Sequence, residues 1–241
     1  MKLIKRADWG ARPPKRPNPI LNPDKLLGVS VHVVDRTVSK VSGLRIISGV
    51  QNWHMDGHTS WKKPWSDIAY CYGVSRQGEV FEAQGLDSPG FAEGQSWNGQ
   101  KGKRLKKIQH NGSWISIVCL TGSLEEAYPP MLQAVGDLVE YIAAAYPSKR
   151  LEVKGHRDIL WNKRPGDIKT CPGDPIASHM REFNARANLT PKPVEKVVPT
   201  AYDNEFAEAI SLKITSGEYP DSPATRRQAA VMALRASKLR R

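Results

Sequence analysis

The sequence has few cysteines: Cys71, Cys119 and Cys171 are the only three in 241 residues. A low, odd count argues against a disulfide-stapled scaffold and suits a reducing compartment. No run of eighteen apolar residues occurs, so no membrane insertion is expected. The first fourteen residues also lack an apolar core of signal-peptide length, which predicts synthesis in the cytoplasm without a standard export signal.

Acidic residues are scarce as well. The 24 Asp and Glu residues are outnumbered by 36 Lys and Arg residues, which gives a formal net charge of +12. Such an excess indicates a polyanionic partner, and nucleic acid and an anionic bacterial cell wall are both candidates. The stretch 101–107, KGKRLKK, holds five of these positive charges. It is either a solvated loop or a contact with an anionic polymer.

The length suits one sizeable core and a small appendage. Alternating and β-branched segments predict strands, while segments of helical period predict helices. We expect strands at 28–34, 68–75, 79–83, 114–121 and 151–153, and helices at 41–55, 129–146 and 174–187. In the first helix the apolar positions are Leu44, Ile47, Val50 and Trp53. This order predicts an α/β domain with a mixed central β-sheet flanked by helices.

The C-terminal part differs in composition. Residues 188–201 contain three prolines and read as a linker. Residues 202–241 contain two amphipathic helical segments, too few for an independent core, so this unit is expected to dock, pair or repeat. We therefore predict a catalytic domain at 1–187, a linker at 188–201 and a small helical unit at 202–241.

One loop carries the most chemistry. The stretch 154–174, KGHRDILWNKRPGDIKTCPGD, follows a predicted strand and presents His156, Lys169 and Cys171. Imidazole and thiolate are ligands that zinc prefers, and a nearby ammonium group lowers a thiol pKa. His32 lies in the predicted strand 28–34 and is either a third ligand or a structural residue. The spacing alone also allows unrelated surface or core residues.

If His32, His156 and Cys171 converge, they leave a fourth position open, which is typical of a catalytic zinc site. Tyr70 and Lys169 would then supply a proton relay and an oxyanion partner. The sequence lacks a His-Glu-x-x-His helix, so a common zinc protease is disfavoured. Trp61 and Trp65 lie in a predicted loop, where they stack on a sugar or base or pack against the core.

Five segments together resemble a known family. They are the arm 6–14 (RADWGARPP), Val31-His32, 65–70 (WSDIAY), 155–158 (GHRD) and 169–173 (KTCPG). In this order they are similar to the zinc-dependent N-acetylmuramoyl-L-alanine amidases, which share a fold with peptidoglycan recognition proteins and phage amidase lysozymes. The resemblance spans roughly residues 5 to 185 and is specific as a set.

The resemblance implies a zinc ion held by His32, His156 and Cys171, assisted by Tyr70 and Lys169. It implies hydrolysis of the amide between N-acetylmuramic acid and L-alanine through a zinc-activated water, with peptidoglycan as partner and no role for nucleic acid. A phage endolysin, made in the host cytoplasm and acting on the wall after release, fits these features.

The chain departs from the family pattern at several positions. Cys71 stands where the family often has His, and Val33 follows His32 where His or Cys is common. The Gly-rich loop 84–113 matches poorly, so peptide specificity is not carried over. Within and beside the expected groove, Trp61, Trp65 and Asn111 are expected to contact substrate.

Two alternatives and the tail complete the expectations. A non-catalytic peptidoglycan-binding protein on the same fold is the first alternative, although such receptors typically lack the cysteine ligand. A basic nucleic-acid-binding protein is the second, but it leaves the His32, His156 and Cys171 set unexplained. Residues 209–217 and 223–230 resemble a single S-layer-homology-like repeat, which indicates either attachment to anionic wall polymers or a plain structural appendage.

Overall fold

A computed structural model describes residues 1–34, 37–38, 40–57, 64–98, 106–159 and 170–189. Within these ranges a six-stranded sheet has the order β1-β4-β3-β7-β2-β8, with β3 and β4 antiparallel and the other neighbours parallel. The strands of this sheet are β1 (Leu3–Ile4), β2 (Gly28–Val34), β3 (Tyr72–Val74), β4 (Val80–Glu82), β7 (Trp114–Gly122) and β8 (Glu152–Gly155). The predicted α/β class with a mixed central sheet is therefore confirmed.

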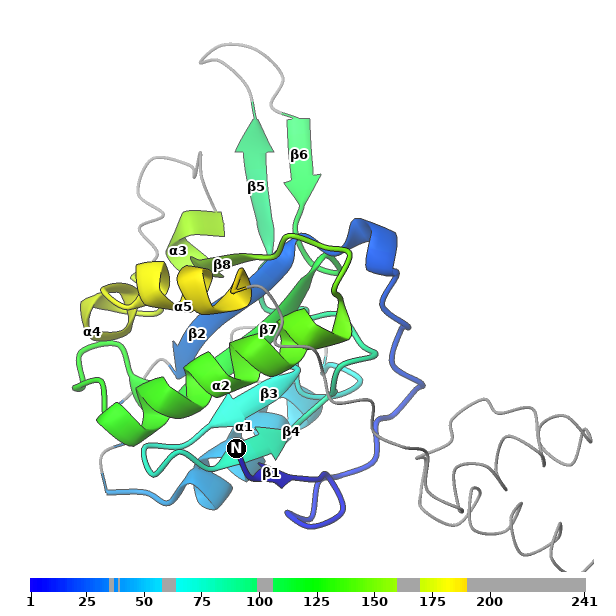
Figure 1. Ribbon diagram of the computed structural model, residues 1–241. Coiled ribbons are helices and arrows are strands. Elements are labelled where there is room, and N and C mark those ends of the chain that lie inside the picture. The colour runs from blue at the N-terminus through cyan, green and yellow to red at the C-terminus, as the bar shows by residue number, and fades with distance from the viewer. Residues whose placement is uncertain (35–36, 39, 58–63, 99–105, 160–169, 190–241) are drawn as a thin grey trace, which may run out of the picture. The chain divides into compact units, whose positions relative to one another are not determined.

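Helices cover both faces of the sheet (Figure 1). The helical elements are η1 (Pro23–Lys25), α1 (Gly43–Asp56), α2 (Pro129–Ala145), α3 (His156–Ile159), α4 (Asp174–Ala177) and α5 (Met180–Ala187). Within the described ranges, none of them has the length and apolar character that a membrane crossing requires.

The two faces follow from the two-residue period of the central strands. In β7, Ile115 and Ile117 pack in the cluster that holds α2 and α5, while Val118 and Leu120 pack in the cluster that holds α1. Every residue of β2 and β7 is buried, as expected for strands covered on both sides. In β2 the same alternation separates Val31 from its neighbours Ser30 and His32, which lie on the face toward α1.

Helix α1 follows the N-cap Ser42 and confirms the predicted helix, but only part of its apolar pattern is buried. Leu44 is 47% exposed, whereas Ile47 and the polar residues Gln51 and His54 are buried. These two polar side chains are acceptable in the interior because each finds hydrogen-bond partners from the segment 67–69.

Two further expectations need correction. The predicted helix 174–187 is two short helices, α4 and α5, separated at residues 178–179. The predicted loop 84–113 contains a two-stranded antiparallel sheet, formed by β5 (Gln95–Asn98) and β6 (Lys106–Gln109). The segments QSWN and KKIQ show no alternation of apolar and polar residues, so sequence periodicity did not predict these strands. Residues 101–105, the unit 202–241 and most of the linker 188–201 lie outside the described residues, so their assignments stay predictions.

The N-terminal arm is fixed by an ion pair whose carboxylate is buried. Arg6 Nη1 lies 3.0 Å from Asp67 Oδ2, and the Asp67 side chain is fully buried. Asp67 also accepts hydrogen bonds from Gln51 Nε2 (2.9 Å) and from its neighbour Ile68 N (2.8 Å). Trp9 is buried nearby and donates from Nε1 to Glu82 O. The arm motif and the segment 65–70 are thus two halves of one structural contact.

Replacing Arg6 with methionine is expected to lower the free energy of unfolding by about 3 kcal/mol, because it leaves the Asp67 carboxylate buried without its cation. Urea denaturation measures this change. The adjacent Lys5 gives a matched control: its ion pair with Glu82 is 57% exposed on the lysine side, and Lys5→Met should cost less than about 1 kcal/mol. Equal losses in the two variants would contradict the assignment.

Candidate functional site

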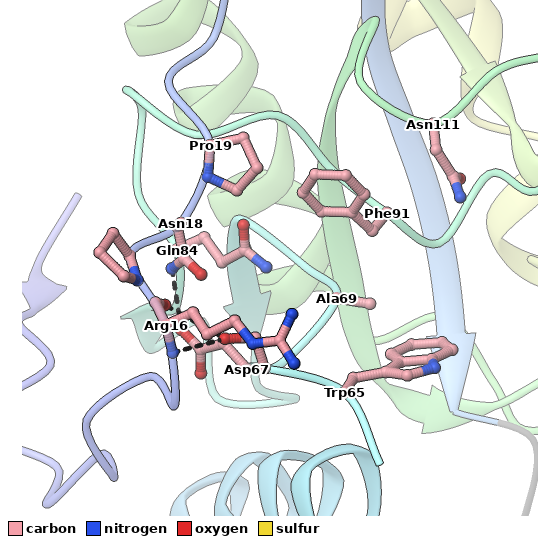
Figure 2. Close-up of a pocket in the computed structure, with 11 residues that line it drawn as sticks. Arg16, Asn18, Pro19, Trp65, Asp67, Ala69, Gln84, Phe91 and Asn111 are labelled. Carbon is pink, nitrogen blue, oxygen red and sulfur yellow. Dashed lines mark hydrogen bonds between the residues drawn. The ribbon is translucent and has the colours of Figure 1, made fainter. Parts of the chain in front are cut away.

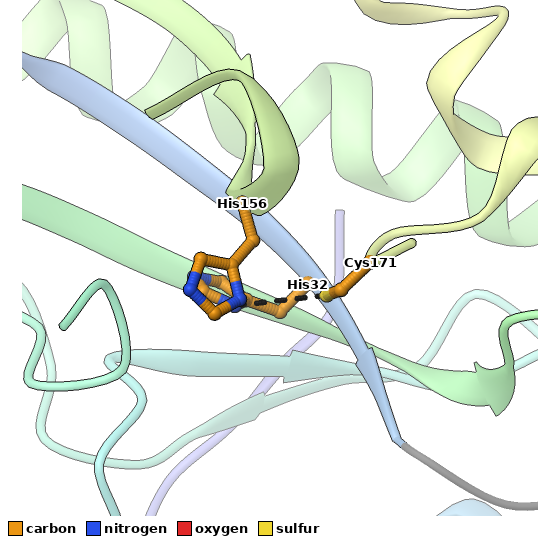
Figure 3. A group of neighbouring side chains, drawn as sticks. All are labelled: His32, His156 and Cys171. Carbon is orange, nitrogen blue, oxygen red and sulfur yellow. Dashed lines mark hydrogen bonds between the residues drawn. The ribbon is translucent and has the colours of Figure 1, made fainter. Parts of the chain in front are cut away.

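Three ligand-type side chains converge beside strand β2 (Figure 3). His32 lies on β2, His156 is the first residue of α3, and Cys171 lies just before α4. One donor atom from each lies within 4.8 Å of the other two. Nδ1 of His32 is 3.9 Å from Sγ of Cys171, and the two imidazole centroids are 4.6 Å apart.

The sheet register brings the two histidines together. Strands β2 and β8 are parallel, with Val31 opposite Gly155, so His32 and His156 follow at the same level of the sheet. Arg157 N donates a hydrogen bond to Cys171 O (2.8 Å). This bond holds the segment that carries Cys171 beside His156. The Arg157 guanidinium also pairs with Asp174 at 2.6 Å. Arg157, whose role the sequence did not reveal, therefore holds the cysteine segment in place.

The donor set fits zinc. Zn–N and Zn–S bonds of about 2.1 and 2.3 Å place tetrahedral ligand atoms about 3.6 Å apart, close to the separation between His32 and Cys171. Burial lowers the pKa of His32 to about 3, so its imidazole is neutral and keeps a lone pair for a metal. Val33 N donates to Cys171 Sγ at 3.4 Å, a contact that favours the thiolate. Among the described residues, these three form the one cluster of His, Cys, Asp or Glu side chains whose donor atoms lie close enough to share a metal ion.

Of the two predicted assisting residues, Tyr70 lies at the site. Its ring centroid is 5.3 Å from that of His32. Its neighbours are fixed by the backbone, since Phe91 N donates to Ala69 O and Cys71 N donates to Ser116 O. Lys169, the predicted oxyanion partner, lies outside the described residues, and so does Trp61.

His54 was not identified from the sequence. It is 2% exposed, and its ring lies between Trp65 (4.6 Å) and Tyr70 (5.7 Å). Its Nδ1 accepts a hydrogen bond from Ala69 N, and burial lowers its pKa to about 4. A row of four rings thus runs from Trp65 through His54 and Tyr70 to His32. His54 lies on the buried side of α1. An apolar sequence pattern does not reveal a buried histidine, so the sequence offered no clear sign of it.

A cleft of about 470 Å³ adjoins this row. Figure 2 shows Arg16 and Asn18, which follow the arm in the chain, on one side and Trp65 and Asn111 on the other. Asn111 is held by a hydrogen bond from Gly94 N to its Oδ1 (2.7 Å). Two residues predicted to contact substrate, Trp65 and Asn111, therefore line the same cleft, although their role stays a prediction.

Glu93 is a second residue that sequence reasoning missed. Its side chain is fully buried, it accepts a hydrogen bond from Ser30, and its Oε1 lies 3.7 Å from His32 Nε2. Burial raises the pKa of Glu93 to about 7. It comes from the loop 84–94, where the match to the amidase pattern is poor.

Comparison with curated proteins finds peptidoglycan recognition proteins, while no family model matches the chain. Peptidoglycan recognition protein 1 of Bos indicus is 27% identical over 165 residues, which is 68% of this chain and 78% of the relative. Peptidoglycan-recognition protein LB of Drosophila melanogaster is 22% identical over 206 residues, 83% of this chain and 80% of the relative.

Solved structures give the same answer. Peptidoglycan recognition protein LE in complex with tracheal cytotoxin, a monomeric diaminopimelic acid-type peptidoglycan, aligns with a TM-score of 0.57 at 19% identity, covering 75% of this chain and 92% of that one. Wild-type Drosophila PGRP-LB aligns with a TM-score of 0.52 at 21% identity, covering 74% and 92%. The mixed sheet, the flanking helices and these alignments show that residues of the N-terminal part adopt the peptidoglycan recognition protein fold.

Proposed function

We propose that this protein is a zinc-dependent amidase that hydrolyses the bond between N-acetylmuramic acid and L-alanine in bacterial peptidoglycan. The convergence of donor atoms from His32, His156 and Cys171 within 4.8 Å carries the proposal. Two neutral imidazoles and one thiolate leave a bound Zn²⁺ with a net charge of about +1 and an open position. Zinc supplies, when bound, a Lewis acid that activates water and polarises the amide carbonyl.

The chain's own residues have separate tasks in this proposal. His32, His156 and Cys171 hold the metal. Tyr70, beside the His32 ring, orients water and moves a proton through its hydroxyl. Lys169, which the sequence places two residues before Cys171, stabilises the oxyanion.

The cleft supports a glycopeptide substrate. Trp65 and Phe91 offer aromatic faces on which a sugar ring stacks, and Asn111 offers an amide to a hydroxyl or peptide group. Arg16 adds a cation at the opposite side, which suits a carboxylate of the stem peptide. The neighbour complexes with tracheal cytotoxin support peptidoglycan as the ligand class.

Purified peptidoglycan tests the proposal. The zinc-loaded chain is expected to release new free amino termini, to stop after chelation and to resume when zinc returns. Release that continues after verified metal removal would reject the zinc mechanism.

The alternative is a non-catalytic peptidoglycan-binding protein, favoured by the many recognition proteins among the relatives. It predicts retention of intact peptidoglycan without stoichiometric zinc. Cys171, placed 3.9 Å from His32, supports the enzyme instead.

An endolysin role is part of the proposal, supported by the resemblance to phage amidase lysozymes and by the net charge of +12, which suits anionic wall polymers. The chain would be made in the host cytoplasm and act on the wall after release, with residues 202–241 attaching to wall polymers. Expressed cells should then lyse only when the membrane is permeabilised, and no lysis after permeabilisation would reject this role.

A further inference from the structure

Glu93 lies in the protein interior, where a carboxyl group lowers the stability of the fold. Its side chain is fully buried, and no lysine or arginine in the described ranges forms an ion pair with it. Its Oε2 is also buried, and the polar groups near the carboxyl group are Ser30, His156 and the backbone N–H groups of residues 92 and 93. Burying a carboxyl group without a paired lysine or arginine lowers stability. The residue is therefore poorly explained by packing alone.

What Glu93 does contact is the far side of a predicted zinc ligand. Ser30 Oγ donates to Glu93 Oε1 at 2.7 Å, and His32 Nε2 lies 3.2 Å from Ser30 Oγ. Since the Ser30 hydroxyl hydrogen points to the carboxyl group, the Ser30 oxygen is left to accept a hydrogen bond from the Nε2–H group of His32. Nε2 of His32 then carries hydrogen, and Nδ1, which faces Cys171, carries the lone pair.

The backbone explains why these groups meet. Ser30 and His32 are two residues apart on β2, so both side chains lie on the same face of the sheet. The loop that carries Glu93 passes over this face, because Gly90 N donates to Trp114 O of β7 (2.7 Å). A Cβ atom at Gly90 would collide with Ser116 Oγ and would lie 2.7 Å from Glu93 Oε1, so glycine leaves room for both side chains.

We propose that Glu93, acting through Ser30, is a positioning residue that fixes the tautomer and orientation of His32 for metal binding. Partners behind a metal-binding histidine orient the ring and raise its basicity. This inference rests on the proposed zinc site. Glu93 and Ser30 are both buried, so neither contacts substrate, and their effect is on the metal.

Zinc affinity, measured by competition with a chromophoric chelator on the purified full chain, tests the inference. Glu93→Ala and Ser30→Ala are each expected to weaken zinc binding about 10- to 100-fold. Glu93→Gln keeps an acceptor for the Ser30 hydroxyl and should restore an affinity close to that of the unsubstituted chain. The absorption bands of the cobalt-substituted protein should shift in the two alanine variants, because the His32 ligand is reoriented.

Ser116 gives the matched control. It lies directly opposite Ser30 in the β2–β7 register and is equally buried, but its hydroxyl contacts Ala69 and Cys71 instead of His32. Ser116→Ala should therefore keep the full zinc affinity. Unchanged affinity in folded Ser30→Ala and Glu93→Ala would overturn the inference while leaving the zinc site intact. Failure of the unsubstituted chain to bind zinc would instead overturn the proposed function, and this inference with it.

Discussion

Replacing Cys171 with alanine is expected to abolish amide hydrolysis and to weaken zinc binding by more than about 100-fold. Loss of a residue that only supports a ligand weakens metal binding by up to about 100-fold, and loss of a ligand itself should cost more. The thiolate supplies the one negative charge of the ligand set, and two neutral imidazoles alone hold Zn²⁺ poorly. Zinc content by elemental analysis and release of amino termini from peptidoglycan measure the two effects. Retention of peptidoglycan by the variant should persist, because the cleft does not contain Cys171.

Cys71 provides the control for this substitution. It is buried at the start of the hairpin, and burial raises the pKa of its thiol to about 12, so it stays protonated. Cys71→Ala should keep zinc and activity. Full activity in Cys171→Ala would show that the thiol is not a ligand.

Replacing Tyr70 with phenylalanine is expected to lower kcat/KM about a hundred- to ten-thousandfold, the range of general acid–base assistance. The ring stays, so its packing beside His32 and the zinc content should be unchanged. Steady-state hydrolysis of a defined muropeptide, with zinc content measured on the same sample, separates these effects.

Tyr146→Phe removes a hydroxyl outside the site. That hydroxyl donates to Leu86 O, so its loss should cost about 1 kcal/mol of stability and no activity. An equal loss of activity in both tyrosine variants would contradict a catalytic role for Tyr70.

Much of this site could be predicted because its two histidines lie in, or directly after, strands that the sequence pattern reveals. His32 sits in an alternating strand, and His156 follows a short strand, so parallel pairing alone brings them to one level. The ligand assignment, however, came from the resemblance of five short segments. Spacing cannot show that Cys171 returns to His32, since that depends on backbone contacts such as the one from Arg157 N to Cys171 O.

The missed residues have a common physical cause. Glu93 and His54 are polar groups in buried positions, and hydrophobic patterns predict burial only for apolar side chains. In α1 the apolar residues Leu44 and Trp53 are not fully buried, whereas Gln51 and His54 take interior places through hydrogen bonds with Asp67 and Ala69. A sequence pattern cannot show that a polar side chain is buried in place of an apolar one, because this depends on hydrogen-bond partners that only the folded structure reveals.

The central claim is that this chain cuts one particular amide bond with zinc. Mass spectrometry of a purified N-acetylmuramoyl peptide, incubated with the zinc-loaded chain, tests it most directly. The account predicts two products, free N-acetylmuramic acid and a peptide beginning with L-alanine, and neither product after chelation. Intact muropeptide bound to the zinc-loaded protein, or cleavage at any other bond, would contradict it.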